Sequence, residues 1–331
     1  MTVERPPQDP AALLHRRQRI LAPLDLELGR GLEIGPLYQP VALKAECDVR
    51  YVDVHRTRGL REYYAAHPGT PVDDIVEVDF PLVVGDRTRS LAEATATAGP
   101  FDWVVASHVI EHVPDLIGWL ADIADVLVDG GRLSLAIPDR RYSFDARRPP
   151  TTVGQMLLAH QHGDTRPSVR AVFDHHHEAV TVDAQAAWDG RPGRETTMFP
   201  LETAHHMAVR AMTEDTYMDC HVWLFTPRSL VRQLQVLARL GLADFTVASV
   251  DPTAVDTLEF FAVLQRMPRD LDPADRARLV DEGFVLPTDH VRPEPEPDPR
   301  FVTSQITRRE QALLDSKRRV SNRLKGLLGR G

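Results

Sequence analysis

The sequence predicts a doubly wound α/β fold with a mostly parallel sheet of seven strands. Phe101 to Asp139 reads as a strand, an amphipathic helix and a second strand joined by short connections. Short apolar runs recur along the chain between helical or polar segments, the order that a parallel sheet requires. Polar residues follow several of these runs, where open α/β sheets bind ligands. An insertion of helices and loops is expected after the fifth strand.

The seven predicted strands are short runs rich in β-branched and apolar residues, bounded by turn-forming residues. In chain order they are Leu32 to Gly35, Val49 to Val54, Ile75 to Phe80, Phe101 to Ala106, Arg132 to Ile137, Phe245 to Val250 and Leu258 to Gln265. The order and spacing favour an open sheet with helices on both faces.

Two helices carry clear end signals. Pro114 to Leu127 places its apolar residues on one face, and the sequence Asp-Gly-Gly that begins at Asp129 stops it. Farther along, Thr226 is an expected N-cap and Pro227 an expected first helical residue, in a helix that runs to about Leu240.

The chain divides into five parts. Residues 1–30 hold an N-terminal helix, and 31–139 and 223–266 form the two halves of the sheet domain. Between them, residues 140–222 are rich in His, Arg, Asp and Pro without clear alternation, which predicts the insertion. Residues 267–331 read as a linker rich in proline and charge, followed by a charged amphipathic helix. That helix is either solvated on its own domain, a self-association helix or a basic anchor.

Composition excludes several classes of protein. The net charge of −9 does not favour nonspecific binding of nucleic acid. Two cysteines, Cys47 and Cys220, form neither a disulfide framework nor a paired-cysteine zinc site. No apolar run reaches the roughly 18 residues of a membrane span, and the amino terminus lacks a signal-peptide core. We therefore expect a soluble cytoplasmic protein with a small-molecule ligand.

Acidic residues and a glycine follow the first three predicted strands. Gly35 lets the chain turn close to a ligand without a Cβ in the way. Asp53 ends the second strand, at about the spacing at which a carboxylate accepts hydrogen bonds from a ribose. Asp79 ends the third strand, where it could receive an adenine amino group. The further glycines of a pyrophosphate-binding loop are missing, since Leu37 and Gln39 stand in their place.

These motifs together resemble the class I S-adenosylmethionine-dependent methyltransferases, whose fold is Rossmann-like. The resemblance rests on LEIGP, the second-strand Asp, VEVDF, FDWVVASHVIEHVPD and DGGRLSLAIPD. It implies S-adenosyl-L-methionine as cofactor and a cofactor site around the ends of the first four strands. The residues that it places in that site are Glu33, Gly35, Pro36, Asp53, Val54, Asp79, Phe80, Ser107, His108 and His112.

Two further segments, PDRRYSFD and YMDCHVWLFTP, resemble a narrower group of methyltransferases associated with polysaccharide and glycosyltransferase pathways. That resemblance implies O-methylation of a saccharide or a sugar-containing small molecule. N- or carboxyl-methylation of another metabolite is the alternative. A nicotinamide-dependent oxidoreductase and a noncatalytic scaffold are less favoured.

The predicted catalytic residues are histidines of the insertion and an aspartate beside it. Sugar hydroxyls are weak acids, so a base is needed, and histidine suits this task near neutral pH. His175 lies in the run Asp-His-His-His-Glu, which could instead hold a divalent metal or form a solvated loop. His221 is a second candidate at the same cleft, and Asp139 could orient a base. Whether a metal assists stays open at this point.

Overall fold

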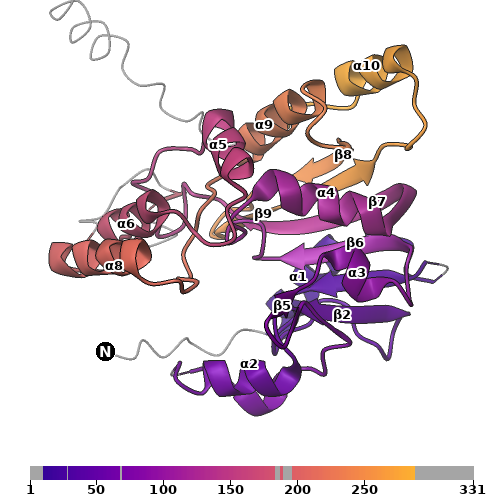
Figure 1. Cartoon of the computed structure of the whole chain (residues 1–331). Coiled ribbons are helices and arrows are strands. Elements are labelled where there is room, and N and C mark those ends of the chain that lie inside the picture. The colour runs from indigo at the N-terminus through magenta and orange to yellow at the C-terminus, as the bar shows by residue number, and fades with distance from the viewer. Residues whose placement is uncertain (1–9, 28, 68, 183–186, 189–195, 288–331) are drawn as a thin grey trace, which may run out of the picture. The chain divides into compact units, whose positions relative to one another are not determined.

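The computed structural model describes residues 10–27, 29–67, 69–182, 187–188 and 196–287 (Figure 1). The chain divides into two units, Met1–Pro287 and Thr288–Gly331. The second unit, including the predicted tail helix and its possible self-association, lies outside the described residues. In the described part, no helix is long and apolar enough to cross a membrane. The cytoplasmic location stays a prediction.

The core of the first unit is a seven-stranded sheet with the strand order β3-β2-β1-β6-β7-β9-β8. All neighbouring strands are parallel except at β9, which runs antiparallel to both β7 and β8. This confirms the predicted doubly wound, mostly parallel sheet. The strands are β1 (Gly31–Ile34), β2 (Val49–Asp53), β3 (Phe80–Pro81), β6 (Phe101–Ser107), β7 (Leu127–Pro138), β8 (Phe245–Asp251) and β9 (Glu259–Arg266).

The third strand is the one that sequence reasoning misplaced. Instead of Ile75 to Phe80, the structure has a short 3-10 helix (Val72–Asp74) and then β3 at Phe80–Pro81. The reason lies in Asp79, whose carboxylate accepts the backbone N–H of Tyr51 at 2.7 Å. The Asp79 side chain thus occupies the Tyr51 N–H. In a longer third strand, this N–H would instead donate to a backbone carbonyl of that strand. A two-stranded hairpin, β4 (Val83–Val84) and β5 (Arg87–Thr88), follows.

Helices cover both faces of the sheet, and each face has its own core. One core contains Val104 and Ala106 of β6 with the apolar side chains of α4 (Leu116–Val126) and α9 (Pro227–Arg239). The other contains Trp103 and Val105 of the same strand, with residues of α1 (Pro10–Leu21). Alternate residues of one buried strand therefore face opposite layers. The remaining helices of the sheet domain are α2 (Thr57–Tyr64), α3 (Leu91–Thr95) and α10 (Pro273–Glu282).

The predicted ends of α9 are confirmed, whereas α4 ends at Val126, and Asp129, Gly130 and Gly131, which were expected to stop that helix, lie within β7. Thr226 caps α9 in a capping box with Ser229, and Pro227 is the first helical residue. Asp115 caps α4 through a hydrogen bond from Gly118 N–H. Part of the predicted tail also joins the fold, since α10 contacts α9 and buries Val280 in the core.

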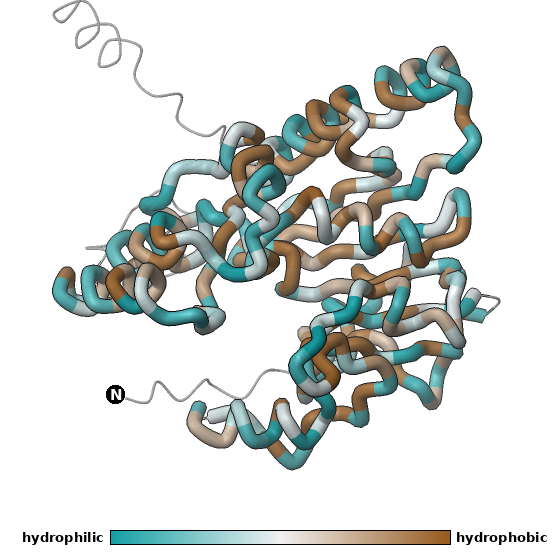
Figure 2. The backbone as a smooth tube through the Cα atoms, in the orientation of Figure 1, coloured by the Kyte–Doolittle hydropathy of each residue, from teal (hydrophilic) through white to brown (hydrophobic). Residues whose placement is uncertain are grey.

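The insertion lies at the carboxyl end of the parallel strands (Figure 1). It contains α5 (Val153–His162), α6 (Val169–Glu178) and α8 (Leu201–Thr213), and α6 packs against α8. Figure 2 shows these helices as a mixture of hydrophilic and hydrophobic residues, whereas the central strands are mainly hydrophobic. The amphipathic helices of the insertion therefore stand beside a largely apolar sheet.

Candidate functional site

The turn after β1 has the shape that the sequence predicted. Gly35 adopts φ 65°, in the left-handed region, and donates its N–H to the Val52 carbonyl at 2.9 Å. A Cβ at this position would stand 3.2 Å from Val109 of the loop after β6. Leu37 also has a positive φ, of 47°. The chain thus leaves the sheet abruptly beside the end of β6, and Pro36 lies within this turn.

Glu33 stabilises the loop that follows this turn through hydrogen bonds to its backbone. Its carboxylate is 1% exposed and accepts the backbone N–H groups of Val41 at 2.7 Å and Ala42 at 2.8 Å. Burial raises the pKa of Glu33 to about 7, against the lowering effect of these two hydrogen bonds. In the protein alone, Glu33 therefore shapes the loop, and its contact with the cofactor stays a prediction.

Asp53 ends β2 as a carboxylate with spare acceptor capacity. In the described part of the chain, its carboxylate accepts one hydrogen bond, from the Val54 N–H at 2.7 Å. Burial raises the pKa of Asp53 to about 6, against the lowering effect of this hydrogen bond. A partly buried carboxylate of this kind suits hydroxyl donors such as those of a ribose. The neighbouring Val54 side chain is half exposed.

Asp79 is occupied within the protein. Its carboxylate forms an ion pair with Lys44 at 2.7 Å and accepts the Tyr51 N–H. Phe80 pairs with Val52 in the sheet and packs against the core. These contacts leave Asp79 less available to adenine than its position in the sequence suggested, and its role there stays a prediction.

Ser107 and His108, at the end of β6, are tied to α1 and β9. Arg16 donates to the Ser107 hydroxyl at 2.7 Å and pairs with Glu259 at 2.7 Å. His108 contacts Glu259 through Nε2 at 2.8 Å and adopts a positive φ of 54°. Burial alone would lower the pKa of His108, but Glu111 and Glu259 outweigh it and raise the pKa to about 9. His108 is therefore a cation near neutral pH.

Next to His108, the side chains of Glu111, His112 and His221 lie close together; we call them the Glu111–His112–His221 cluster. One ligand-type atom from each lies within 4.8 Å of the others. The segment with His221 is brought there by the backbone, since the N–H groups of Val222 and Trp223 donate to the Glu111 carbonyl at 2.7 and 3.2 Å. Side chains from two distant parts of the chain thus meet at the carboxyl end of β6.

Both histidines of the cluster are oriented by a carboxylate. His112 Nδ1 contacts Asp219 at 2.7 Å, and His221 Nδ1 contacts Asp145 at 2.6 Å. Asp145 is 1% exposed and also pairs with Arg148 at 2.8 Å. When Nδ1 donates its hydrogen to a carboxylate, the lone pair is left on Nε2. Each ring therefore presents its basic nitrogen to other partners.

Asp139 does not have the predicted orienting role in this structure. Its buried carboxylate accepts hydrogen bonds from Arg141, at 2.6 Å, and from the Thr253 hydroxyl, at 2.7 Å. These contacts fix the chain as it leaves β7. Asp145, six positions farther along in the insertion, orients the base candidate instead.

His175 is also unsuited to the role that its sequence context suggested. Its Nδ1 accepts the backbone N–H of His221 at 3.3 Å. Burial, reinforced by His221 and Arg148, lowers the pKa of His175 to about 3, so the ring is a weak base. Its neighbours in α6 face elsewhere: His176 Nδ1–H donates to the Val172 carbonyl of its own helix at 2.8 Å, and His177 is exposed. Of the three consecutive histidines, His175 therefore contacts the backbone of His221, and the three do not form a catalytic or metal site together.

Sequence reasoning missed Glu111, Asp145 and Asp219 as site residues. The signal for Glu111 was present, because His-x-x-Glu-His follows a buried strand in a tight turn. Asp219 likewise stands two residues before His221. Nothing in the local pattern around Asp145 points to His221, which is far away in the chain.

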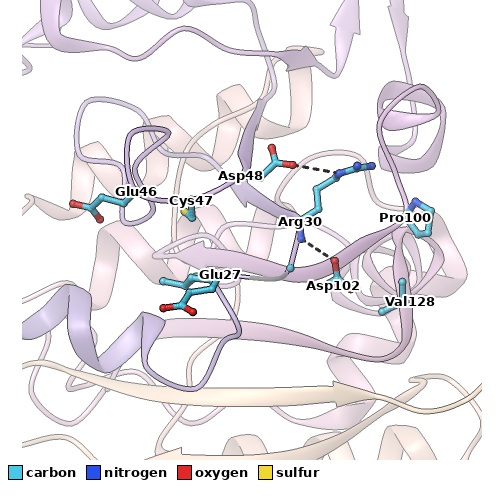
Figure 3. Close-up of a pocket in the computed structure, with 10 residues that line it drawn as sticks. Glu27, Arg30, Glu46, Cys47, Asp48, Pro100, Asp102 and Val128 are labelled. Atoms are coloured by element: carbon cyan, nitrogen blue, oxygen red, sulfur yellow. Dashed lines mark hydrogen bonds and ion pairs between the residues drawn. The ribbon is translucent and has the colours of Figure 1, made fainter.

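A separate pocket lies at the opposite end of the sheet (Figure 3). It surrounds Arg30, whose N–H donates to Asp102 at 2.8 Å and whose Nε lies 3.6 Å from Asp48. The pocket adjoins the amino ends of β1 and β6, whereas ligands of open α/β sheets bind at the carboxyl ends. None of the predicted site residues lines it.

Comparison with known proteins found similar solved structures and one matching family. Three of the solved structures are similar to this chain at low identity. The CcbJ methyltransferase from Streptomyces caelestis is 14% identical over 76% of this chain and 89% of that one, with a TM-score of 0.38. An S-adenosylmethionine-dependent methyltransferase from Mesorhizobium loti is 13% identical over 78% and 99%, with a TM-score of 0.38. Magnesium protoporphyrin IX methyltransferase from Synechocystis PCC 6803 is 11% identical over 77% and 82%, with a TM-score of 0.34.

No curated protein matches the sequence significantly. The family assignment rests on a different comparison, in which the sequence matches the methyltransferase domain family over residues 7–237. This match spans the sheet from β1 to β7, the insertion and most of α9. The chain therefore belongs to the methyltransferase domain family and is a class I S-adenosylmethionine-dependent methyltransferase.

Proposed function

We propose that this enzyme transfers the methyl group of S-adenosylmethionine to a hydroxyl oxygen of a saccharide or sugar-containing small molecule. One observation carries the proposal. The two segments that resemble methyltransferases of saccharide pathways, PDRRYSFD and YMDCHVWLFTP, contribute Asp145 and His221, which are hydrogen bonded at 2.6 Å. The features of the narrower resemblance thus meet at one place beside the cofactor-binding strands.

The chemistry requires little beyond alignment and deprotonation. The acceptor oxygen attacks the methyl carbon, the carbon–sulfur bond breaks, and S-adenosylhomocysteine leaves as a neutral thioether. The hydroxyl must lose its proton, and a sugar hydroxyl is too weak an acid to do so unaided. His221 of the Glu111–His112–His221 cluster would accept this proton on Nε2, since its Nδ1 contacts Asp145.

The cofactor would be held by the strand ends beside the cluster. Asp53 would accept hydrogen bonds from the ribose hydroxyls, and the Gly35 turn would pass under the methionine part. Val109 stands 3.2 Å from the position of a Cβ at Gly35, so the cofactor turn and the loop carrying the cluster are neighbours. This proximity supports a sulfonium and an acceptor hydroxyl that meet in one region.

A labelled-methyl assay tests the proposal. The enzyme would be incubated with radiolabelled S-adenosylmethionine and a panel of sugars, sugar nucleotides, amines and carboxylic acids. We expect incorporation into hydroxyl acceptors as an alkali-stable ether. Incorporation into amines or carboxylates alone would establish the alternative and overturn this proposal. Calorimetric titration with S-adenosylhomocysteine, without any acceptor, verifies separately that the cofactor site is intact.

A further inference from the structure

We propose that the Glu111–His112–His221 cluster is a binding site for one divalent transition-metal ion, with the Glu111 carboxylate and the Nε2 atoms of the two histidines as ligands. Two imidazoles and one carboxylate are a ligand set that zinc, iron(II) and manganese(II) accept while leaving coordination positions open. In the described part of the chain, this is the group whose three ligand atoms lie within 4.8 Å of one another.

The first argument is the state of Glu111. Its side chain is 1% exposed, and neither carboxylate oxygen has a hydrogen-bond partner. The nearest charged groups are His108 Nδ1 at 3.4 Å and His112 Nε2 at 3.9 Å, each beyond a good hydrogen bond. Glu111 therefore has the His108 cation as an ion-pair partner, but its two buried oxygens accept no hydrogen bond, which costs free energy that a bound ion would offset.

The second argument is the pair of carboxylates behind the histidines. Asp219 and Asp145 contact the Nδ1 atoms of His112 and His221 at 2.7 and 2.6 Å. Histidines that bind metals almost always donate their second ring N–H to a carboxylate or carbonyl in this way. That partner fixes the tautomer, aims Nε2 and makes it a stronger ligand. Both histidines of the cluster have this support, which a single structural histidine would not require.

The third argument is the rigidity of the backbone at the cluster. The Glu111 carbonyl accepts the N–H groups of Val222 and Trp223, and Trp223 Nε1 donates to the Val113 carbonyl at 2.6 Å. The Tyr217 hydroxyl also donates to the His112 carbonyl, at 3.0 Å. The two segments that carry the ligands are thus joined around the site, so binding does not require them to be assembled first.

The distances also allow a common ion. Ligand atoms that are each about 2.1 Å from one ion in a tetrahedral arrangement lie about 3.4 Å apart. The ligand atoms of the cluster lie within 4.8 Å of one another, so they would have to approach by at most roughly 1.4 Å through rotation of the side chains. His108 would still pair with Glu259 after Glu111 turned toward the ion.

The ion would take part in the proposed methyl transfer by activating the acceptor hydroxyl. This role, unlike metal binding itself, rests on the proposed function. An acceptor hydroxyl bound to the ion becomes a stronger acid, so its proton can leave to bulk water before the oxygen attacks the methyl group. His221 would then be a ligand rather than the base. Asp145 and Asp219 would be positioning residues, acting through the histidines.

Metal binding is tested without cofactor or acceptor, so that the result is independent of the proposed function. Tag-free protein would be stripped with a chelator, dialysed and titrated by calorimetry with Zn²⁺ and Mn²⁺, and Co²⁺ would be followed by its visible absorption bands. We expect one ion per chain and a rise in the melting temperature. Glu111→Gln and His221→Asn should each weaken binding by about 100-fold or more, and Asp219→Asn by roughly tenfold.

His205→Gln is the matched control, because His205 is an exposed histidine of α8 that lies outside the cluster. It should bind the ion like the wild type. Circular dichroism and titration with S-adenosylhomocysteine identify any variant that fails to fold. Absence of stoichiometric binding to wild type, or binding that survives both Glu111→Gln and His221→Asn in folded protein, would overturn the proposal. Metal binding without transfer to any hydroxyl would contradict the proposed function and leave this site standing.

Discussion

The proposed cofactor side and the proposed acceptor side of this enzyme are built in different ways. The proposed cofactor side, at the ends of β1 and β2, is made by short stretches of chain: the Glu33 carboxylate accepts backbone N–H groups eight and nine residues away. The proposed acceptor side joins residues that are far apart, such as Asp145 and His221, at a separation of 76 positions. The cofactor side depends mainly on backbone conformation, and the acceptor side depends on side-chain contacts. Substitutions should therefore change cofactor affinity and catalytic rate separately.

The largest expected effect is on the acceptor side. His221→Asn removes Nε2 as either base or ligand and should lower kcat by about 1,000-fold. Binding of S-adenosylhomocysteine should change little, because the cofactor side does not depend on His221. Steady-state kinetics and calorimetry measure the two quantities on the same protein. An equal loss of cofactor affinity would show that the two sides are not separate.

The next effect is on folding stability and belongs to the cofactor side. The pKa of Glu33 is about 7 in the folded chain, raised from its ordinary value of 4.5 by burial. The protonated form is therefore favoured by folding, and the free energy of unfolding should fall as pH rises between 4.5 and 7. The loss is about 3 kcal/mol at 1.36 kcal/mol per pKa unit.

Urea unfolding of the wild type and of Glu33→Gln at pH 5 and pH 8 measures this contribution. The difference between the two proteins isolates Glu33 from the other titrating groups. A glutamine does not titrate, so the variant should lose less stability over the same range. Parallel pH curves for the two proteins would contradict the assignment.

Asp145→Asn should lower kcat of the folded enzyme by about 100-fold, and it should also lower thermal stability, because buried Arg148 loses its counter-charge. An asparagine no longer stabilises the His221 ring with Nε2 free, although it keeps the size of the side chain. Asp139→Asn is the matched control, because Asp139 contacts Arg141 and Thr253 rather than a histidine. It should reduce thermal stability with a smaller effect on kcat of the folded enzyme. The reverse pattern would restore the role that the sequence suggested for Asp139.

The smallest effect concerns Asp53. Its pKa is about 6, above the ordinary value of 3.8, and the ionised form is the one that accepts hydrogen bonds from a ribose. Affinity for S-adenosylhomocysteine should therefore rise with pH through 6 and be about tenfold weaker at pH 5 than at pH 7. Calorimetry across this range measures the slope. Asp53→Asn should bind more weakly and show a flat profile, and a slope unchanged in this variant would exclude the ribose role.

The sequence predicted the local geometry of the strand ends better than the contacts of the insertion, for a physical reason. Gly35 and Asp53 follow buried strands whose periodicity is visible locally, and the structure places them at adjacent strand ends. Asp79 was harder, because a single side-chain hydrogen bond to Tyr51 shortened the strand. The contact between Asp145 and His221 depends on how an insertion folds back, and no local period records that. His175 was chosen for its histidine-rich context, which says nothing about burial.

The hydrogen bond between Asp145 and His221 has a consequence for how such enzymes diversify. Asp145 stands near the beginning of the insertion and His221 at its end, so the two ends of this segment are fastened together at the chemical centre. The segment between them contains α5, α6 and α8. A change in the length or surface of this segment would leave His221 in place as long as the Asp145–His221 hydrogen bond is kept.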